Sequence, residues 1–247
     1  MSKYKHLIGL GILMILMSVV FYVIYYERIH DTKSLIDSIV ANMAFTFVQI
    51  LLWVIIIERV LADREKRLMM EKMNMVIGTF FSEVGTKLIN DFTKIDTELD
   101  SIRKELIVTN NWGDAEFALE SRSVKKHGFN VKPSAADLIG LKAALRERRD
   151  FLLRLLENPV LLEHETFTEL LRAVFHINEE LESRDDLTNL PASDMNHLAV
   201  DIKRAYSLLT VEWLEYMKHL KASYPYLFSH AVRTNPFDRE ASPIVTS

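Results

Sequence analysis

Two apolar segments without any charged residue most constrain the fold of this 247-residue chain. Residues 7–26 contain 17 apolar residues, and residues 38–57 contain 16. Twenty helical residues extend about 30 Å, which matches the thickness of the hydrocarbon core of a bilayer. The sequence therefore predicts a transmembrane helical hairpin over residues 1–58, held in the lipid bilayer.

The first segment has one competing interpretation, a cleaved signal peptide. Lys3 and Lys5 precede it, as basic residues precede the apolar core of a signal peptide. However, the bulky residues Tyr25 and Tyr26 end the segment, where a signal peptidase requires small side chains. We therefore expect this segment to remain as a membrane span.

The basic residues around the two segments predict their orientation. The short connection carries two of them, whereas the outer flanks carry seven, and basic residues concentrate on the cytoplasmic side. Both termini are therefore predicted to be cytoplasmic, in a plasma or inner membrane if the source is prokaryotic. The residues counted are Arg28 and Lys33 in the connection, and Lys3, Lys5, Arg59, Arg64, Lys66, Arg67 and Lys72 in the flanks.

The second segment carries four polar residues on one helical face. They are spaced four, four and three apart, and lipid cannot satisfy their hydrogen bonds. The face is expected to pack against the first span or against another copy of the chain; lining a pore is the alternative. Neither segment contains an Asp, Glu, Lys, Arg or His. The four residues are Ser38, Asn42, Thr46 and Gln49.

A heptad-like apolar pattern follows in residues 59–108, which contain no proline. Its spacing of three and four residues predicts a juxtamembrane helical stalk of coiled-coil type. Such a stalk favours a homo-oligomer. Gly78 and Gly85 within it would allow either close helix approach or bending. The seam comprises Phe81, Val84, Leu88, Phe92, Ile95, Leu99, Ile102 and Leu106.

The rest of the chain predicts an all-α cytosolic domain over residues 109–238, with a disordered tail over 239–247. Apolar residues recur at helical spacing, and neither strand alternation nor a hairpin turn is found. Four helices are expected, at residues 134–158, 163–183, 190–222 and from Tyr224 to about Arg233.

The composition excludes several classes of function. The absence of Cys removes disulfides, thiolate metal sites and cysteine nucleophiles, and no Gly-rich phosphate-binding motif is found. From residue 58 onward, 26 Lys or Arg stand against 31 Asp or Glu, which disfavours nucleic acid as the partner. No cofactor is predicted.

Histidines and carboxylates at helical spacing are the only candidate metal ligands. The di-iron helical bundles require repeated Glu-x-x-His pairs, which this part of the chain lacks. We therefore expect ordinary local hydrogen bonds rather than a metal site. The candidate residues are His176, Glu179, Asp194, His197 and Asp201.

A basic face and an aromatic segment complete the candidates. Lys142, Arg146 and Arg149 recur at helical spacing and either form a solvated face or bind a small anionic ligand. The segment from Tyr224 to Asp238 is rich in aromatic residues. Docking on the helical bundle is its expected role, and a recognition surface is the alternative.

No catalytic constellation emerges from these residues, so an enzyme is disfavoured. The leading hypothesis is a membrane-anchored, homo-oligomeric helical protein that presents a cytosolic domain for interaction with a protein or for sensing. One alternative is a ligand-gated effector that forms a pore or perturbs the membrane. A second is a helical-bundle enzyme that uses metal or phosphate ligands.

Overall fold

The computed structural model describes residues 2–29 and 32–245, without the side chains of residues 2–12, 29, 32, 35 and 44. The fold is all-α, as the sequence predicts. No strand occurs in the described residues, where Asp96 and Val131 form an isolated antiparallel bridge. Internal contacts divide the chain into two units, Met1–Lys66 and Arg67–Ser247.

The first unit contains α1 (Ser2–Ile29) and the beginning of α2 (Thr32–Phe80). The helical run Ile36–Ile95 is long and apolar enough to cross a membrane, and its most apolar stretch is not buried in the protein. The span predicted at residues 7–26 begins with residues 7–12, whose side chains lie outside the described residues. The predicted connection likewise includes residues 30 and 31, which are not described.

The polar face of α2 contacts α1 within this unit. The Asn42 amide donates a hydrogen bond of 3.3 Å to the Tyr22 hydroxyl. The Thr46 hydroxyl donates to the Asn42 carbonyl at 2.8 Å, so it is satisfied within its own helix. Ser38 is partly buried and Gln49 is exposed. The bond between Asn42 and Tyr22 favours the packing interpretation of this face.

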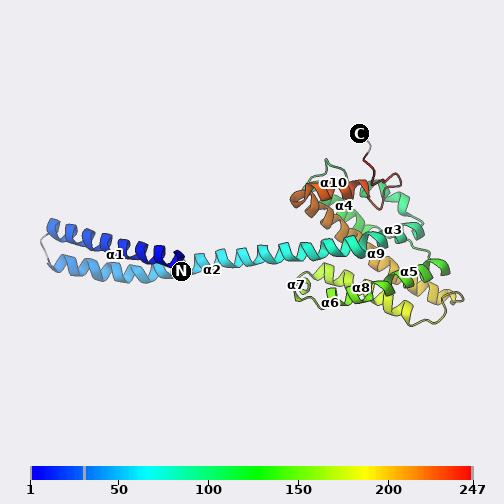
Figure 1. Ribbon diagram of the computed structural model, residues 1–247, viewed down its shortest axis with the longest axis horizontal. Helices are drawn as coiled ribbons and strands as arrows, with labels where there is room; N and C mark the ends of the chain where they lie inside the picture. Colours follow the sequence, from blue (N-terminus) through cyan, green and yellow to red (C-terminus); the bar gives the residue numbers. More distant parts are fainter. Residues whose placement is uncertain (1, 30–31, 246–247) are drawn as a thin grey trace. The chain divides into compact units, whose positions relative to one another are not determined.

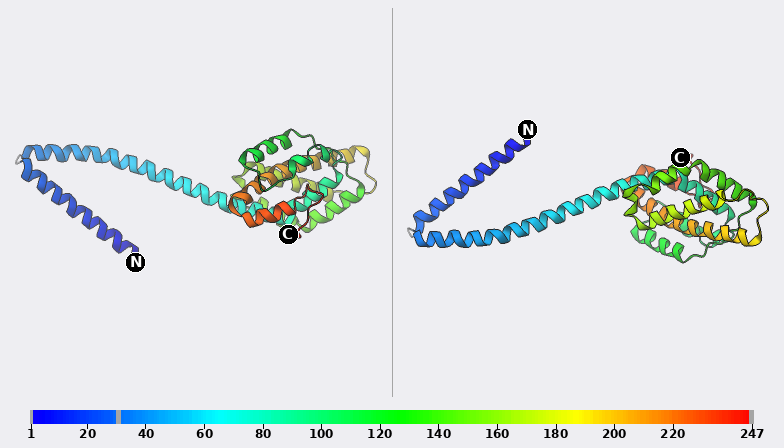
Figure 2. Two further views of the ribbon diagram at one scale, coloured as in Figure 1. Left: turned by 90° about the horizontal axis from the view of Figure 1, so that it is seen from above. Right: turned by 90° about the horizontal axis from the view of Figure 1, so that it is seen from below.

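The second unit is a helical domain organised around its longest complete helix, α9. This helix packs against α3, α4, α8 and α10 (Figures 1 and 2). The elements after α2 are a π-helical turn (Phe81–Gly85), α3 (Thr86–Ile95), 3₁₀ turns (Leu99–Ser101 and Arg103–Leu106), α4 (Asp114–Lys126), α5 (Ala135–Glu147), α6 (Arg149–Leu156), α7 (Pro159–Leu162), α8 (Glu165–Glu182), α9 (Ala192–Ser223) and α10 (Pro225–Arg233).

The predicted stalk differs from the structure. Its eight seam residues are buried in the core of the second unit, where Phe80 and Phe81 meet edge to face at 5.3 Å. The α-helical run ends at Ile95, and not near residue 108, because Asp96 is extended. The seam is therefore an internal packing surface. Apolar residues spaced three and four apart occur both on a helix buried within its own domain and on a coiled coil, so the spacing does not distinguish the two structures.

Gly85 accounts for the tight aromatic packing at the start of the domain. A Cβ atom there would lie 2.7 Å from Cδ1 of Phe81 and 2.9 Å from Cε1 of Phe80. Real Cβ atoms do not approach other atoms this closely, so a glycine is needed between these rings. Both rings belong to the helical run that contains Gly85, so this contact does not decide between close helix approach and bending, the two roles considered for this glycine.

Two further differences concern the predicted helices. The helix expected at residues 134–158 is interrupted at Arg148, which separates α5 from α6. Helix α4 was not expected, because only Phe117, Ser121 and Val124 of its polar sequence are buried. Helices α8, α9 and α10 match the expected segments within a few residues.

The C-terminal segment docks on the domain through two of its four aromatic residues. Phe228 and Phe237 are buried, whereas Tyr224 and Tyr226 are exposed. Phe237 meets Trp213 edge to face, with the ring centres 5.2 Å apart. In the predicted tail, Arg239 forms an ion pair with Asp100 at 2.9 Å, and residues 246 and 247 lie outside the described residues.

Candidate functional site

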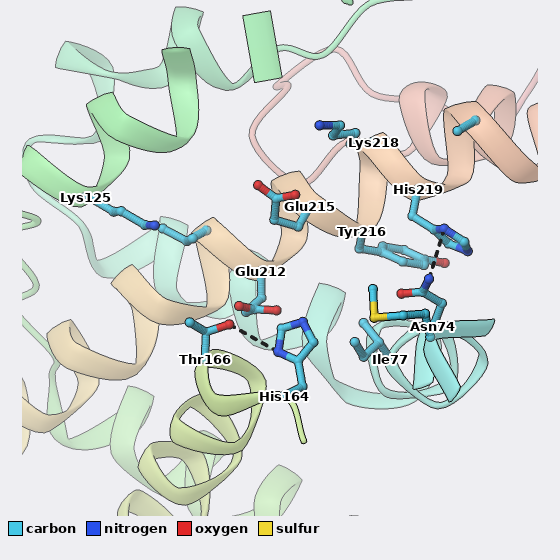
Figure 3. A pocket seen from close by; sticks show the side chains of 13 residues that line it. Asn74, Ile77, Lys125, His164, Thr166, Glu212, Glu215, Tyr216, Lys218 and His219 are labelled. Carbon is cyan, nitrogen blue, oxygen red and sulfur yellow. Dashed lines mark hydrogen bonds between the residues drawn. The ribbon is translucent and has the colours of Figure 1, made fainter. Parts of the chain in front are cut away.

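A cavity of about 520 Å³, lined by polar groups within a mainly apolar surface, opens between the C-terminal part of α2 and helices α4, α8 and α9. Every residue that lines the cavity belongs to the second unit, Arg67–Ser247. Figure 3 shows the side chains that line it. Its size lies within the range of cavities that bind small molecules. The lining residues are Met70, Asn74, Ile77, Lys125, His164, Thr166, Val211, Glu212, Glu215, Tyr216, Lys218, His219 and Ala222.

Glu212 is the buried acid of this cavity, with 3% of its surface exposed. Burial raises the pKa of its carboxyl, and the nearby Glu215 acts in the same direction. A hydrogen bond from Thr166 acts in the opposite direction, as do the nearby side chains of His164 and Lys125. A carboxyl that is buried in a cavity and has a raised pKa is typical of a functional site.

His164 lies beside this acid with one ring nitrogen already occupied. Its Nδ1 accepts the backbone N–H of Phe167 at 3.1 Å and so caps the start of α8. The Thr166 hydroxyl lies 3.2 Å from the same nitrogen (Figure 3). A neutral imidazole that accepts at Nδ1 carries its proton on Nε2. The second ring nitrogen is therefore available as a donor.

Helices α2 and α9 meet at the other end of the cavity. The amide nitrogen of Asn74 lies 3.3 Å from Nδ1 of His219 (Figure 3). Burial lowers the pKa of the His219 imidazole, which favours its neutral form. Tyr216 stacks on Phe81 at 4.9 Å, and burial raises the pKa of its hydroxyl. These groups are neutral hydrogen-bonding partners at neutral pH.

The charged amines of the cavity come from α4 and α9. Lys218 forms an ion pair with the exposed Asp114 at 3.5 Å. Lys125 is exposed and contributes positive charge to the surroundings of Glu212. A ligand in this cavity would thus meet a buried acid, two imidazoles and a phenol, with amines beside them. The arrangement suits recognition of a small polar molecule through several hydrogen bonds.

The structure brings three of the five candidate metal ligands together. His176 and His197 each place Nε2 at 3.5 Å from Oδ2 of Asp201. Asp194 instead binds Arg184 through two hydrogen bonds, and Glu179 is exposed. In the described residues, no group of three or more His, Asp or Glu side chains is placed so that it could hold a metal ion.

Glu180 joins this cluster and was not among the sequence candidates. Its two carboxylate oxygens lie 3.9 Å from Nε2 of His176 and 3.5 Å from Nε2 of His197. The spacing of four residues between His176 and Glu180 could have indicated it, because such residues share a helical face. Sequence alone does not reveal that α8 and α9 are neighbours.

The basic candidates do not converge on a common site. Lys142 donates to the carbonyl of Arg184 at 2.8 Å. Arg146 forms a two-pronged ion pair with Glu182, and the Arg149 guanidinium lies 5.7 Å from the centre of the Phe175 ring. Each cation already has a partner within the domain, so this face offers no assembled anion site.

Comparison with known proteins defines the family of this all-α protein. Residues 69–233 match the family described as "Uncharacterized protein MJ1433, C-terminal helical domain", and residues 2–61 match "MJ1433, N-terminal helical domain". "Uncharacterized protein MJ1433" from Methanocaldococcus jannaschii is 39% identical over 241 residues, which cover 98% of this chain and 97% of that protein. The chain therefore belongs to the MJ1433 family. No solved structure matches it.

Proposed function

We propose that this protein is a membrane-anchored sensor whose cytosolic helical domain binds a small polar molecule in the cavity around Glu212. In this proposal, residues 7–26 and 38–57 span the bilayer and both termini lie in the cytoplasm. The exposed apolar side chains of α2, such as Phe47 and Trp53, support lipid contact. Homo-oligomerisation through the spans remains part of the proposal.

One observation carries the sensing part of the proposal. Helix α2 runs unbroken from Thr32 to Phe80, and its residues Met70, Asn74 and Ile77 line the cavity. A molecule in the cavity would therefore contact the same helix that contains the second apolar segment. Contacts such as the one between Asn74 and His219 would then depend both on the bound ligand and on the position of this helix.

A binding screen on the full chain in detergent tests the ligand. Polar metabolites are added to the purified protein, and the midpoint of thermal unfolding is measured. A specific ligand raises the midpoint of the wild type by mass action. It has a much smaller effect on Glu212→Gln, which keeps the size of the side chain but loses its charge. If every stabilising compound acted equally on both proteins, the cavity would not be the binding site.

The absence of Cys makes the predicted topology directly testable. Single cysteines are introduced as Lys33→Cys in the connection and Asp185→Cys before α9. A maleimide that cannot cross membranes should label position 33 in intact cells, and position 185 after permeabilisation alone. Labelling of both positions in intact cells, or of neither, would contradict the proposed orientation.

A further inference from the structure

The wall that α9 presents to the cavity contains two carboxyl groups. Glu212 and Glu215 are three residues apart and both line the cavity, so they share one face of the helix (Figure 3). Lys218, the lysine of α9 that lines the cavity, forms an ion pair at 3.5 Å with Asp114, which is not a lining residue. Its charge is therefore partly balanced outside the cavity. The two carboxyl groups are the main charged groups of this wall.

Glu212 has a capacity to accept hydrogen bonds that the protein leaves largely unused. A carboxylate has two oxygens and about four acceptor positions. Thr166 supplies a hydrogen bond to this group. In the part of the chain that the structure describes, no ion pair joins Glu212 to a basic side chain, and the nearby Lys125 is exposed. A ligand that brings a cationic N–H group would stabilise this nearly buried carboxyl.

Most other polar groups of the cavity carry no charge. Burial raises the pKa of the Tyr216 hydroxyl and lowers the pKa of the His219 imidazole, so both groups favour their neutral forms. The side chains of Asn74 and Thr166 do not ionise. A charged ligand would thus interact mainly with the carboxyl groups of α9 and with the exposed Lys125.

The depth of these groups decides which charge dominates. Only 3% of the surface of Glu212 is exposed, whereas Lys125 is in contact with solvent. A charge interaction is several times stronger in a partly buried site than in bulk water, because water screens the exposed group. The innermost charged group of the cavity is therefore an acid, and it favours a cationic ligand.

Apolar side chains line the cavity beside this acid. Ile77 and Val211 are buried core residues, and Met70 also lines the cavity. Such a lining suits the hydrocarbon part of an organic molecule. A bare metal ion fits less well, because no cluster of His, Asp and Glu among the described residues could hold one. An organic cation matches both the acid and the apolar wall.

We propose that the cavity binds a small organic amine, whose ammonium group donates hydrogen bonds to Glu212 and whose hydrocarbon part contacts Ile77 and Val211. This inference rests on the proposed function and names the chemical class of its ligand. An ammonium group has one positive charge and up to three N–H donors, so it provides both the charge and the hydrogen bonds that Glu212 can accept. The exposed Glu215 adds negative charge along the approach to the cavity.

Matched compounds test this class of ligand on the full chain in detergent. Butylamine, cyclohexylamine and benzylamine are each compared with an alcohol and a carboxylate of similar size and shape. Each compound is titrated into the protein while heat and the midpoint of thermal unfolding are recorded. We expect saturable binding of at least one amine, with one molecule per chain and a rise in the midpoint. This amine should bind at least about tenfold more tightly than its matched alcohol and carboxylate.

Variants test whether the amine binds at Glu212. Glu212→Gln should weaken amine binding at least about tenfold, which corresponds to about 1.4 kcal/mol. Glu179→Gln removes the same charge from an exposed position of α8 outside the cavity and should leave the affinity unchanged. Lys125→Gln should raise the affinity for an amine, because it removes a positive charge near the site. The same substitution would lower the affinity for an anion.

The proposal fails if no amine binds more tightly than its matched alcohol, or if Glu212→Gln binds amines as the wild type does. Preferred binding of a carboxylate that is weakened in Lys125→Gln would also overturn it, since the cavity would then bind anions. The proposed function would survive these results if another compound in the wider screen depended on Glu212. Circular dichroism identifies any variant that is unfolded, and the comparison of amine with alcohol on the wild type then decides the matter.

Discussion

Asn74 of α2 and His219 of α9 lie side by side, with the amide nitrogen of one 3.3 Å from Nδ1 of the other. This is a side-chain hydrogen bond across 145 positions of sequence, and it is partly buried. It joins the last turns of α2 to the central helix of the domain. The contact thus belongs both to the wall of the cavity and to the packing of the domain.

The first prediction concerns this hydrogen bond. Asn74→Ala should lower the free energy of unfolding of the domain by about 1 kcal/mol, the usual net worth of such a bond. Urea unfolding of the full chain in detergent, followed by Trp fluorescence, measures the change. Thr79→Ala is the control, because its exposed hydroxyl bonds only to Met75 of the same helix. An equal loss in both variants would contradict a specific role for Asn74.

The second prediction is a pH dependence caused by Glu212. Burial raises the pKa of its carboxyl above the ordinary value of 4.5. The folded chain then holds this proton more tightly than the unfolded chain, so this group lowers stability as the pH rises from about 4.5 through the folded pKa. Glu212→Gln removes the dependence. The difference in unfolding free energy between the two proteins, measured from about pH 5 to about pH 8, should therefore grow in favour of Gln.

The control for that experiment is built into the comparison. Burial lowers the pKa of His219 below its ordinary value of 6.5, so this group reduces stability as the pH falls through that value. His219 is present in both proteins, and its contribution cancels in the difference. A difference that stayed constant with pH would show that Glu212 titrates normally.

The third prediction pairs two glycines in helical backbone. Gly85→Ala should destabilise the domain by about 1–3 kcal/mol, because its methyl group would collide with Phe80 and Phe81. Gly140→Ala should instead stabilise it by up to about 1 kcal/mol, because a Cβ atom added at this position of α5 would meet no atom within 4 Å beyond its chain neighbours and its own helix backbone. Thermal unfolding of both variants measures the effects. The same sign in both would refute the argument from close packing.

The fourth prediction concerns the C-terminal segment. Phe237→Ala should cost about 3–5 kcal/mol, because its ring is fully buried against Trp213. Tyr226→Ala should change stability by less than about 0.5 kcal/mol, since Tyr226 is 72% exposed. Chemical denaturation distinguishes the two. Loss of a binding activity in Tyr226→Ala without loss of stability would support the alternative role of this segment as a recognition surface.

The sequence predicted the all-α class and the later helices because their apolar residues recur clearly and prolines mark their starts. Pro225 begins α10 and Ser134 caps α5, as expected. The residues after α2 were harder to interpret. Apolar residues recur there at every third or fourth position. This spacing does not reveal whether the surface that covers them belongs to the same chain or to another copy of it.

The sites depended on information that a linear pattern lacks. Glu212 lies between Leu209 and Trp213 on α9, and nothing local distinguishes it from a solvated glutamate. Side chains from α2, α4 and the start of α8 line the same cavity, and these elements lie far from Glu212 in the sequence. His176 and His197 were candidates individually, but their meeting at Asp201 required knowledge of which helices are neighbours. Packing between helices, and not composition, brings together the residues of the cavity and those of this cluster.

The continuity of α2 has a thermodynamic consequence for the cavity. Met70, Asn74 and Ile77 line the cavity and belong to a helix that begins at Thr32. A ligand that binds one position of these turns more tightly than another shifts the helix toward that position, and the shift is limited by the difference between the two affinities. The coupling is reciprocal. Any change that displaces these turns must alter ligand affinity by the same factor, and the occupancy of the cavity would then report on the position of the helix.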